Sequence, residues 1–103
     1  MRQKAVYGAP DLIIEIVSPN DRPSDIIALE TDYRSIEVPE IWFIDQPKRR
    51  VLMLRKRPDG YAEEEVTTGT LRSEAVSGFD LSVEWLFADP RPNILDTLTK
   101  LLA

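Results

Sequence analysis

Two residue types are missing altogether from this 103-residue chain, and both absences restrict its chemistry. Without cysteine there are no disulfides and no zinc sites built from thiolates. Without histidine there is no imidazole to act as a general base, to join a catalytic triad or to ligate a metal. Any catalysis would therefore rest on carboxylates, lysines, tyrosines or a bound metal ion.

Long apolar runs are lacking as well. No stretch reaches the length of a membrane span, and residues 1–4 are not followed by the apolar segment of a signal peptide. We therefore expect a cytoplasmic protein with no membrane partner. The length and the 43% apolar content fit one small domain over residues 1–103. The net charge of −5 does not favour a general attraction to nucleic acid, although a local basic patch can still bind it.

The most informative stretch reads Pro-Asp-Leu-Ile-Ile-Glu-Ile-Val-Ser-Pro over residues 10–19. Its β-branched residues predict a strand over 11–17 that is buried on both faces. Asp11 and Glu15 are four residues apart and so point to the same side, about 13 Å apart in a straight strand. A kink near Asp11 would bring them close enough to share a metal. A carboxylate in such a strand needs a partner, which is a divalent cation, a basic side chain or backbone amides.

A helix and a second strand follow this stretch. Over residues 24–36, Ile26, Leu29, Tyr33 and Ile36 form one apolar stripe at helical spacing, and we expect the Tyr33 hydroxyl at the rim of the core. Residues 41–44 predict an apolar strand that contains Trp42 and Phe43 as core residues. A strand, a helix and a strand in this order favour a crossover that makes the two strands parallel.

The rest of the chain predicts a hairpin and a C-terminal helix. Strands over 50–57 and 61–68 flank a turn at 58–60, and a short strand within 70–76 precedes a helical turn near residue 85. Asn93 can cap a last helix over 94–102, which would pack on the domain or on a partner subunit. The fold class is therefore α/β, with a mixed sheet, a helical crossover and an antiparallel hairpin.

Basic residues cluster at 48–50 and 55–57. They could form a phosphate-binding strip, but the glutamates at 63–65 would face them across the hairpin, with Arg55 opposite Glu63. We favour charge pairing across the hairpin over a strip that binds nucleic acid.

Three motifs in matching order resemble the putative restriction endonuclease domain family, a bacterial group with a PD-(D/E)XK nuclease fold. The first is the stretch over 10–19. The second is Tyr33 followed by Val-Pro-Glu-Ile-Trp-Phe-Ile-Asp over 38–45, and the third is Gly-Phe-Asp-Leu over 78–81 with Leu86 and Phe87. The resemblance implies a restriction-endonuclease-like core. It also implies that Asp11 and Glu15 are catalytic carboxylates that bind a metal, that the Ile16 carbonyl is a further ligand, and that the ion is magnesium or manganese. The reaction implied is hydrolysis of DNA phosphodiester bonds.

The chain departs from the family pattern at its basic residue. Val17 stands where PD-(D/E)XK enzymes usually carry a lysine, and Leu29 stands at this family's alternative lysine position on the helix. The segment before Asp11 is also shorter than is usual in the family, so we expect a partial copy of the domain. We therefore predict a nuclease-like domain with impaired hydrolysis that binds one divalent ion and forms a homodimer. The competing hypothesis is a non-catalytic structural or regulatory assembly module that retains the fold.

Overall fold

The computed structural model describes residues 4–7, 11–88, 93, 94, 96, 97 and 100. Its elements in chain order are β1 (Lys4–Tyr7), β2 (Leu12–Val17), α1 (Pro23–Ser35), β3 (Glu40–Asp45), β4 (Arg50–Arg57), β5 (Gly60–Val66), β6 (Thr70–Arg72), β7 (Asp80–Ser82) and α2 (Val83–Leu86). No helix among the described residues is both long and apolar enough to cross a membrane.

The main sheet has five strands in the order β1-β2-β3-β4-β5. β2 and β3 are parallel, with Ile13 opposite Ile41, and α1 connects them. The other neighbours in this sheet are antiparallel, while β6 and β7 form a separate two-stranded sheet. The predicted mixed α/β fold and the parallel pairing around the crossover helix are both confirmed.

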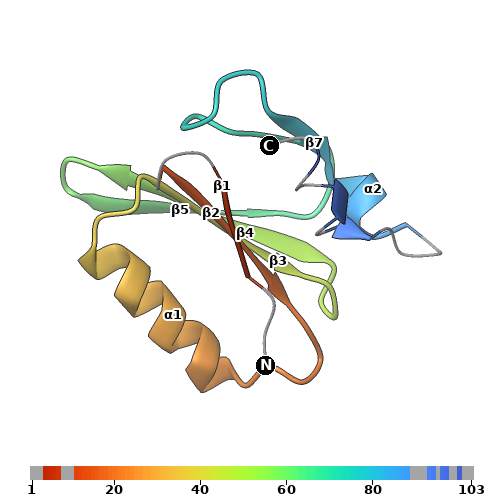
Figure 1. The fold of residues 1–103 in the computed structure, drawn as a ribbon, viewed down its shortest axis with the longest axis horizontal. Helices are drawn as coiled ribbons and strands as arrows, with labels where there is room; N and C mark the ends of the chain where they lie inside the picture. The colour runs from red at the N-terminus through yellow and green to blue at the C-terminus, as the bar shows by residue number, and fades with distance from the viewer. Residues whose placement is uncertain (1–3, 8–10, 89–92, 95, 98–99, 101–103) are drawn as a thin grey trace.

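Each face of the sheet packs against a different layer. α1 covers one face, and β7 with α2 lies on the other (Figure 1). Alternate side chains along β2 therefore enter different cores: Ile13 packs with the α1 layer, whereas Leu12 and Ile14 pack with the opposite layer. Trp42 is fully buried on that opposite side and stacks on Phe79, with 5.6 Å between ring centroids.

The helix α1 begins with Pro23 in its first turn, where a missing N–H costs nothing. Ile26 and Leu29 pack against the core and Tyr33 is buried in it. Ile36 does not extend this stripe, because it lies beyond the last helical turn and is 68% exposed. Its predicted place at the end of the helical stripe was wrong, since the chain leaves helical geometry there and Glu37 takes a positive φ of 58°.

The β4–β5 hairpin differs from its predicted register by one residue. Gly60 takes a φ of 131° and pairs with Arg57, so the turn has two residues rather than three. Arg55 consequently lies opposite Ala62, and Glu63 lies opposite Leu54 on the α1 face. A shift of one residue moves each side chain to the other face of the sheet, so the predicted pair between Arg55 and Glu63 was wrong.

The C-terminal elements complete the second layer. Ser82 caps α2 by accepting a hydrogen bond from the Trp85 amide at 3.3 Å. Asn93 acts as the predicted cap, since its Oδ1 accepts from the Asp96 amide at 3.0 Å. Of the helix predicted over 94–102, residues 94, 96, 97 and 100 are helical, and the remaining positions lie outside the described residues. Ile94 is buried in the same core as Trp42, so this segment contacts the domain itself.

Candidate functional site

Glu15 lies near the middle of β2 with its side chain on the α1 face, and its exposed fraction is 0%. Tyr33, on α1, donates its hydroxyl to Glu15 Oε2 at 2.6 Å. Both groups are buried, and they are 18 residues apart in the sequence. The Tyr33 hydroxyl therefore does not lie at the rim of the core as predicted. It helps to compensate a carboxylate that has been removed from water.

This contact follows from how α1 packs on the sheet. Ile26, Leu29 and Tyr33 recur at helical spacing, so all three face β2 and β3. Strand alternation places Glu15 on the same face as Ile13, inside the surface that this stripe covers. Sequence reasoning had identified both residues but had not paired them. The available signal was a single acidic residue in a buried strand together with a single hydroxyl on the apolar stripe of the helix that covers it.

Asp11 is the residue directly before β2, in a turn, and it is exposed. Its carbonyl accepts a hydrogen bond from the Glu40 amide at 3.1 Å, which ties the start of β2 to the start of β3. Ile16 follows Glu15 in β2 and is half-buried. The structure thus places Glu15 and Ile16 on β2 and Asp11 in the turn before it, with Asp11 exposed and Glu15 fully buried.

The chemistry of this donor set suits a hard divalent ion. The Asp11 and Glu15 carboxylates and the Ile16 carbonyl offer only oxygen, which magnesium and manganese prefer. Within the described ranges, no group of three or more acidic side chains is placed to hold a metal. Magnesium commonly binds through one or two carboxylates and completes its shell with water and substrate phosphates.

The two positions at which a lysine was expected are apolar and half-buried. Leu29 lines an open hollow of about 710 Å³ beside α1, together with Asp25 and Asp32. Val17 lines a different hollow, at the carboxyl ends of β2 and β3. A side chain at position 29 thus has room to extend, and Asp25 and Asp32 line the same hollow.

A second buried carboxylate, Glu40 on the opposite face, was not recognised as important from the sequence. Its exposed fraction is 1%. Glu40 Oε1 accepts from Ser73 Oγ at 2.9 Å and from the amides of Glu74 and Ala75 at 2.9 and 2.8 Å. Oε2 accepts from the Trp42 indole N–H at 2.7 Å. This carboxylate therefore holds the 73–75 loop against the sheet, and its role is structural.

The basic residues of the hairpin are largely engaged in ion pairs. Arg50 lies 3.6 Å from both Asp45 and Glu65. Arg57 forms two hydrogen bonds with Glu74, each at 3.0 Å. The hydrogen bond from Arg57 is the main reason that the pKa of Glu74 lies below its usual value. These contacts support charge pairing rather than a phosphate-binding strip.

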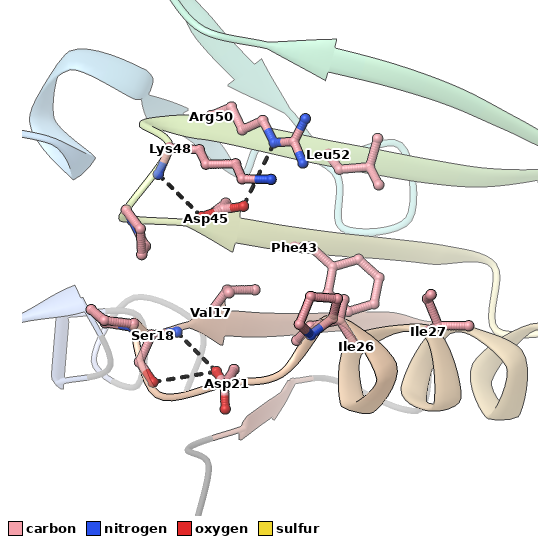
Figure 2. A pocket seen from close by; sticks show the side chains of 13 residues that line it. Val17, Ser18, Asp21, Ile26, Ile27, Phe43, Asp45, Lys48, Arg50 and Leu52 are labelled. Carbon is pink, nitrogen blue, oxygen red and sulfur yellow. Dashed lines mark hydrogen bonds and ion pairs between the residues drawn. The ribbon is translucent and has the colours of Figure 1, made fainter.

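A further hollow of about 340 Å³ opens at the carboxyl ends of β2 and β3 (Figure 2), where open α/β sheets commonly bind ligands. Phe43 and Val17 contribute to its apolar wall. Asp45 Oδ1 accepts from the Lys48 amide at 3.2 Å, and Asp21 accepts from the Ser18 amide at 2.8 Å. Its complete lining is Val17, Ser18, Pro19, Asp21, Pro23, Ile26, Ile27, Phe43, Asp45, Pro47, Lys48, Arg50 and Leu52. Two acidic and two basic side chains line it, so it shows no excess of either charge.

Comparison with known proteins agrees with the resemblance in the motifs. Residues 2–84 match the Uma2 family, which is described as "Putative restriction endonuclease". The fold is similar to the crystal structure of a "putative nuclease belonging to DUF820" from Anabaena variabilis, with 20% sequence identity and a TM-score of 0.59. That match covers 75% of this chain and 43% of the nuclease chain, so this chain spans less than half of its length. No curated protein matches the chain.

Proposed function

Since the chain belongs to the Uma2 family of putative restriction endonucleases, we propose that it is a nuclease-like domain directed at DNA phosphodiester bonds, with impaired hydrolysis. The observation that carries the proposal is the surroundings of Glu15. Its carboxylate is fully buried beneath α1 and accepts a hydrogen bond from the Tyr33 hydroxyl. Leu29 occupies the helix position from which a lysine would contact the site.

In this proposal Asp11, Glu15 and the Ile16 carbonyl would hold magnesium or manganese. When bound, such an ion supplies Lewis-acid polarisation of the phosphodiester and favours ionisation of the attacking water. Asp11, at the exposed end, would be the carboxylate accessible to solvent and substrate. Leu29 adds no positive charge, so stabilisation of the charge that develops on the phosphate would lose one contributor.

The same observation favours a second candidate, a non-catalytic structural or regulatory assembly module. A fully buried Glu15 that is bonded to Tyr33 serves folding whether or not hydrolysis occurs. DNA as a partner, a homodimer and a cytoplasmic location remain predictions under either candidate.

Leu29→Lys is the substitution that separates the two candidates. We expect it to raise manganese-dependent nicking of supercoiled plasmid by about 10²-fold to 10³-fold, which is typical when one oriented charge is restored. Asp25 and Asp32 lie four residues before and three residues after position 29, and they can hold the new ammonium on the helix surface. The substitution should therefore also be tested in combination with Asp25→Asn and Asp32→Asn.

The matched control is Leu29→Gln, which adds a polar side chain without a charge. Activity gained with lysine, absent with glutamine and abolished again by Glu15→Ala would support the nuclease proposal. If the lysine variants cleave no better than the wild type, the non-catalytic module is the better account. If the wild-type chain already cleaves as efficiently as a relative that carries the lysine, the predicted impairment is wrong.

A further inference from the structure

The apolar hollow at the carboxyl ends of β2 and β3 lies apart from the predicted metal ligands (Figure 2). Among the described residues that line it there is no Asp11, Glu15 or Ile16. Asp11 precedes β2 and Val17 ends it, so at a rise of about 3.3 Å per residue the two positions lie roughly 20 Å apart. The volume of about 340 Å³ falls in the range of small-molecule pockets. The hollow can therefore take a ligand of its own, whatever the chain does at Asp11 and Glu15.

The apolar wall of this hollow is incompletely covered by the protein. Phe43 is buried, whereas Val17, Ile26 and Leu52 are only partly buried. Ile27, on α1, also lines the hollow and is 65% exposed. Because these side chains border one concave space that is open to water, a ligand with an apolar body would remove apolar surface from solvent.

The charged side chains of the hollow are not equally available to a ligand. Arg50 lies 3.6 Å from both Asp45 and Glu65, so its charge is already compensated. The Lys48 amide donates to Asp45 Oδ1 at 3.2 Å, which fixes the turn after β3. The Lys48 side chain extends from this turn beside Asp45 (Figure 2), and its ammonium forms no ion pair with any residue that the structure describes. Lys48 is thus the cation that this wall offers to a ligand.

We infer that the hollow binds a small carboxylate with an apolar ring or chain, whose carboxylate pairs with Lys48 and whose body contacts Phe43 and Leu52. A single negative charge matches the Lys48 ammonium. A phosphate monoester, with a charge of about −1.5 to −2 at pH 7, would be repelled more strongly by Asp21 and Asp45, which line the same hollow. The inference goes beyond the proposed nuclease function and does not rest on it.

Cinnamate and cinnamamide are suitable probes, since they share an apolar body and differ in charge. The full chain is labelled with ¹⁵N and titrated with each probe while its amide NMR resonances are followed. We expect both probes to shift the amides of residues that line the hollow, such as Ser18, Phe43 and Lys48. Cinnamate should bind about fivefold more tightly, the value of a partly exposed ion pair.

Two substitutions at exposed positions test the two parts of the recognition without disturbing the core. Lys48→Gln should weaken cinnamate binding about fivefold and leave cinnamamide binding unchanged. Lys56→Gln is the matched control, because Lys56 pairs with Glu37 at 3.7 Å and does not line the hollow. Ile27→Ser should weaken both probes alike, since it removes apolar surface and no charge.

A preference for cinnamate that Lys48→Gln abolishes and Lys56→Gln retains supports the inference. The inference is overturned if neither probe gives saturable shifts at the lining residues up to several millimolar, or if the two probes bind the wild type equally. It also fails if Lys48→Gln and Lys56→Gln have the same effect, or if Ile27→Ser weakens neither probe. These titrations contain no DNA and no divalent metal, so the nuclease proposal is tested separately.

Discussion

Glu40→Gln tests the buried network on the second face of the sheet with the smallest change of shape. Glutamine keeps one carbonyl oxygen, which can still accept from Ser73 and from the amides of Glu74 and Ala75. The other oxygen becomes an amide group, whose N–H would face the Trp42 indole N–H, a donor facing a donor. The substitution therefore removes one short hydrogen bond and leaves a buried donor without its acceptor.

The expected cost follows from these contacts. A hydrogen bond to a charged acceptor contributes about 1.5–3 kcal/mol, and a buried donor left unsatisfied costs a comparable amount, part of which is the same energy. The substitution also removes the ion pair between Glu40 and Arg55, at 3.6 Å, while Arg55 keeps Glu64 and Glu74 as partners. We expect a total loss of about 2–4 kcal/mol in the free energy of unfolding.

Urea unfolding followed by tryptophan fluorescence measures this loss. With a denaturant slope of about 2 kcal/mol/M, the midpoint should fall by about 1–2 M. Glu63→Gln is the control, since it removes an exposed glutamate that lies 3.4 Å from Arg34 and should cost less than about 1 kcal/mol. If Glu40→Gln lowers the midpoint no further than Glu63→Gln, the buried network does not anchor the 73–75 loop.

Two further predictions concern pH. The pKa of Glu74 is lowered in the folded state, mainly by the hydrogen bond from Arg57, so its contribution to stability is present above the ordinary value of 4.5 and is lost as the pH falls through the folded value. The difference in urea midpoint between the wild type and Glu74→Gln should accordingly shrink on acidification, and a constant difference would contradict this. The pKa of Tyr61 is raised, mainly by burial, so its contribution is present below the ordinary value of 10.0 and is lost as the pH rises through the folded value. Tyr61→Phe should lose less stability than the wild type between about pH 9 and pH 11, and parallel losses in the two proteins would refute the assignment.

The central part of the fold could be predicted because its sequence signals are local. Two apolar runs on either side of an amphipathic helix favour a parallel crossover, and the structure has this arrangement in β2, α1 and β3. The hairpin register was less predictable, because it depends on the backbone of Gly60. Its positive φ makes Gly60 the first paired residue of β5, which reverses the faces of Glu63 and Glu64.

The sequence predicted residues of the candidate site but not the contacts between them. Asp11 and Glu15 could be identified from a motif, whereas the bond from Tyr33 depends on how α1 docks on the sheet. Glu40 gave no useful local signal, because the three groups that bond to its Oε1 lie 33–35 residues further along the chain. Such contacts are set by tertiary packing, which periodicity and composition do not describe.

The backbone and the side chain of Glu40 make hydrogen bonds in different parts of the molecule. Its amide holds the carbonyl of Asp11 at the open end of the candidate site, while its carboxylate anchors the 73–75 loop on the far side of the sheet. A lineage that gave up hydrolysis would be free to change Asp11, but it would not be free to change Glu40. Selection for folding would then retain Glu40, whose role is structural, after the reaction itself had been lost.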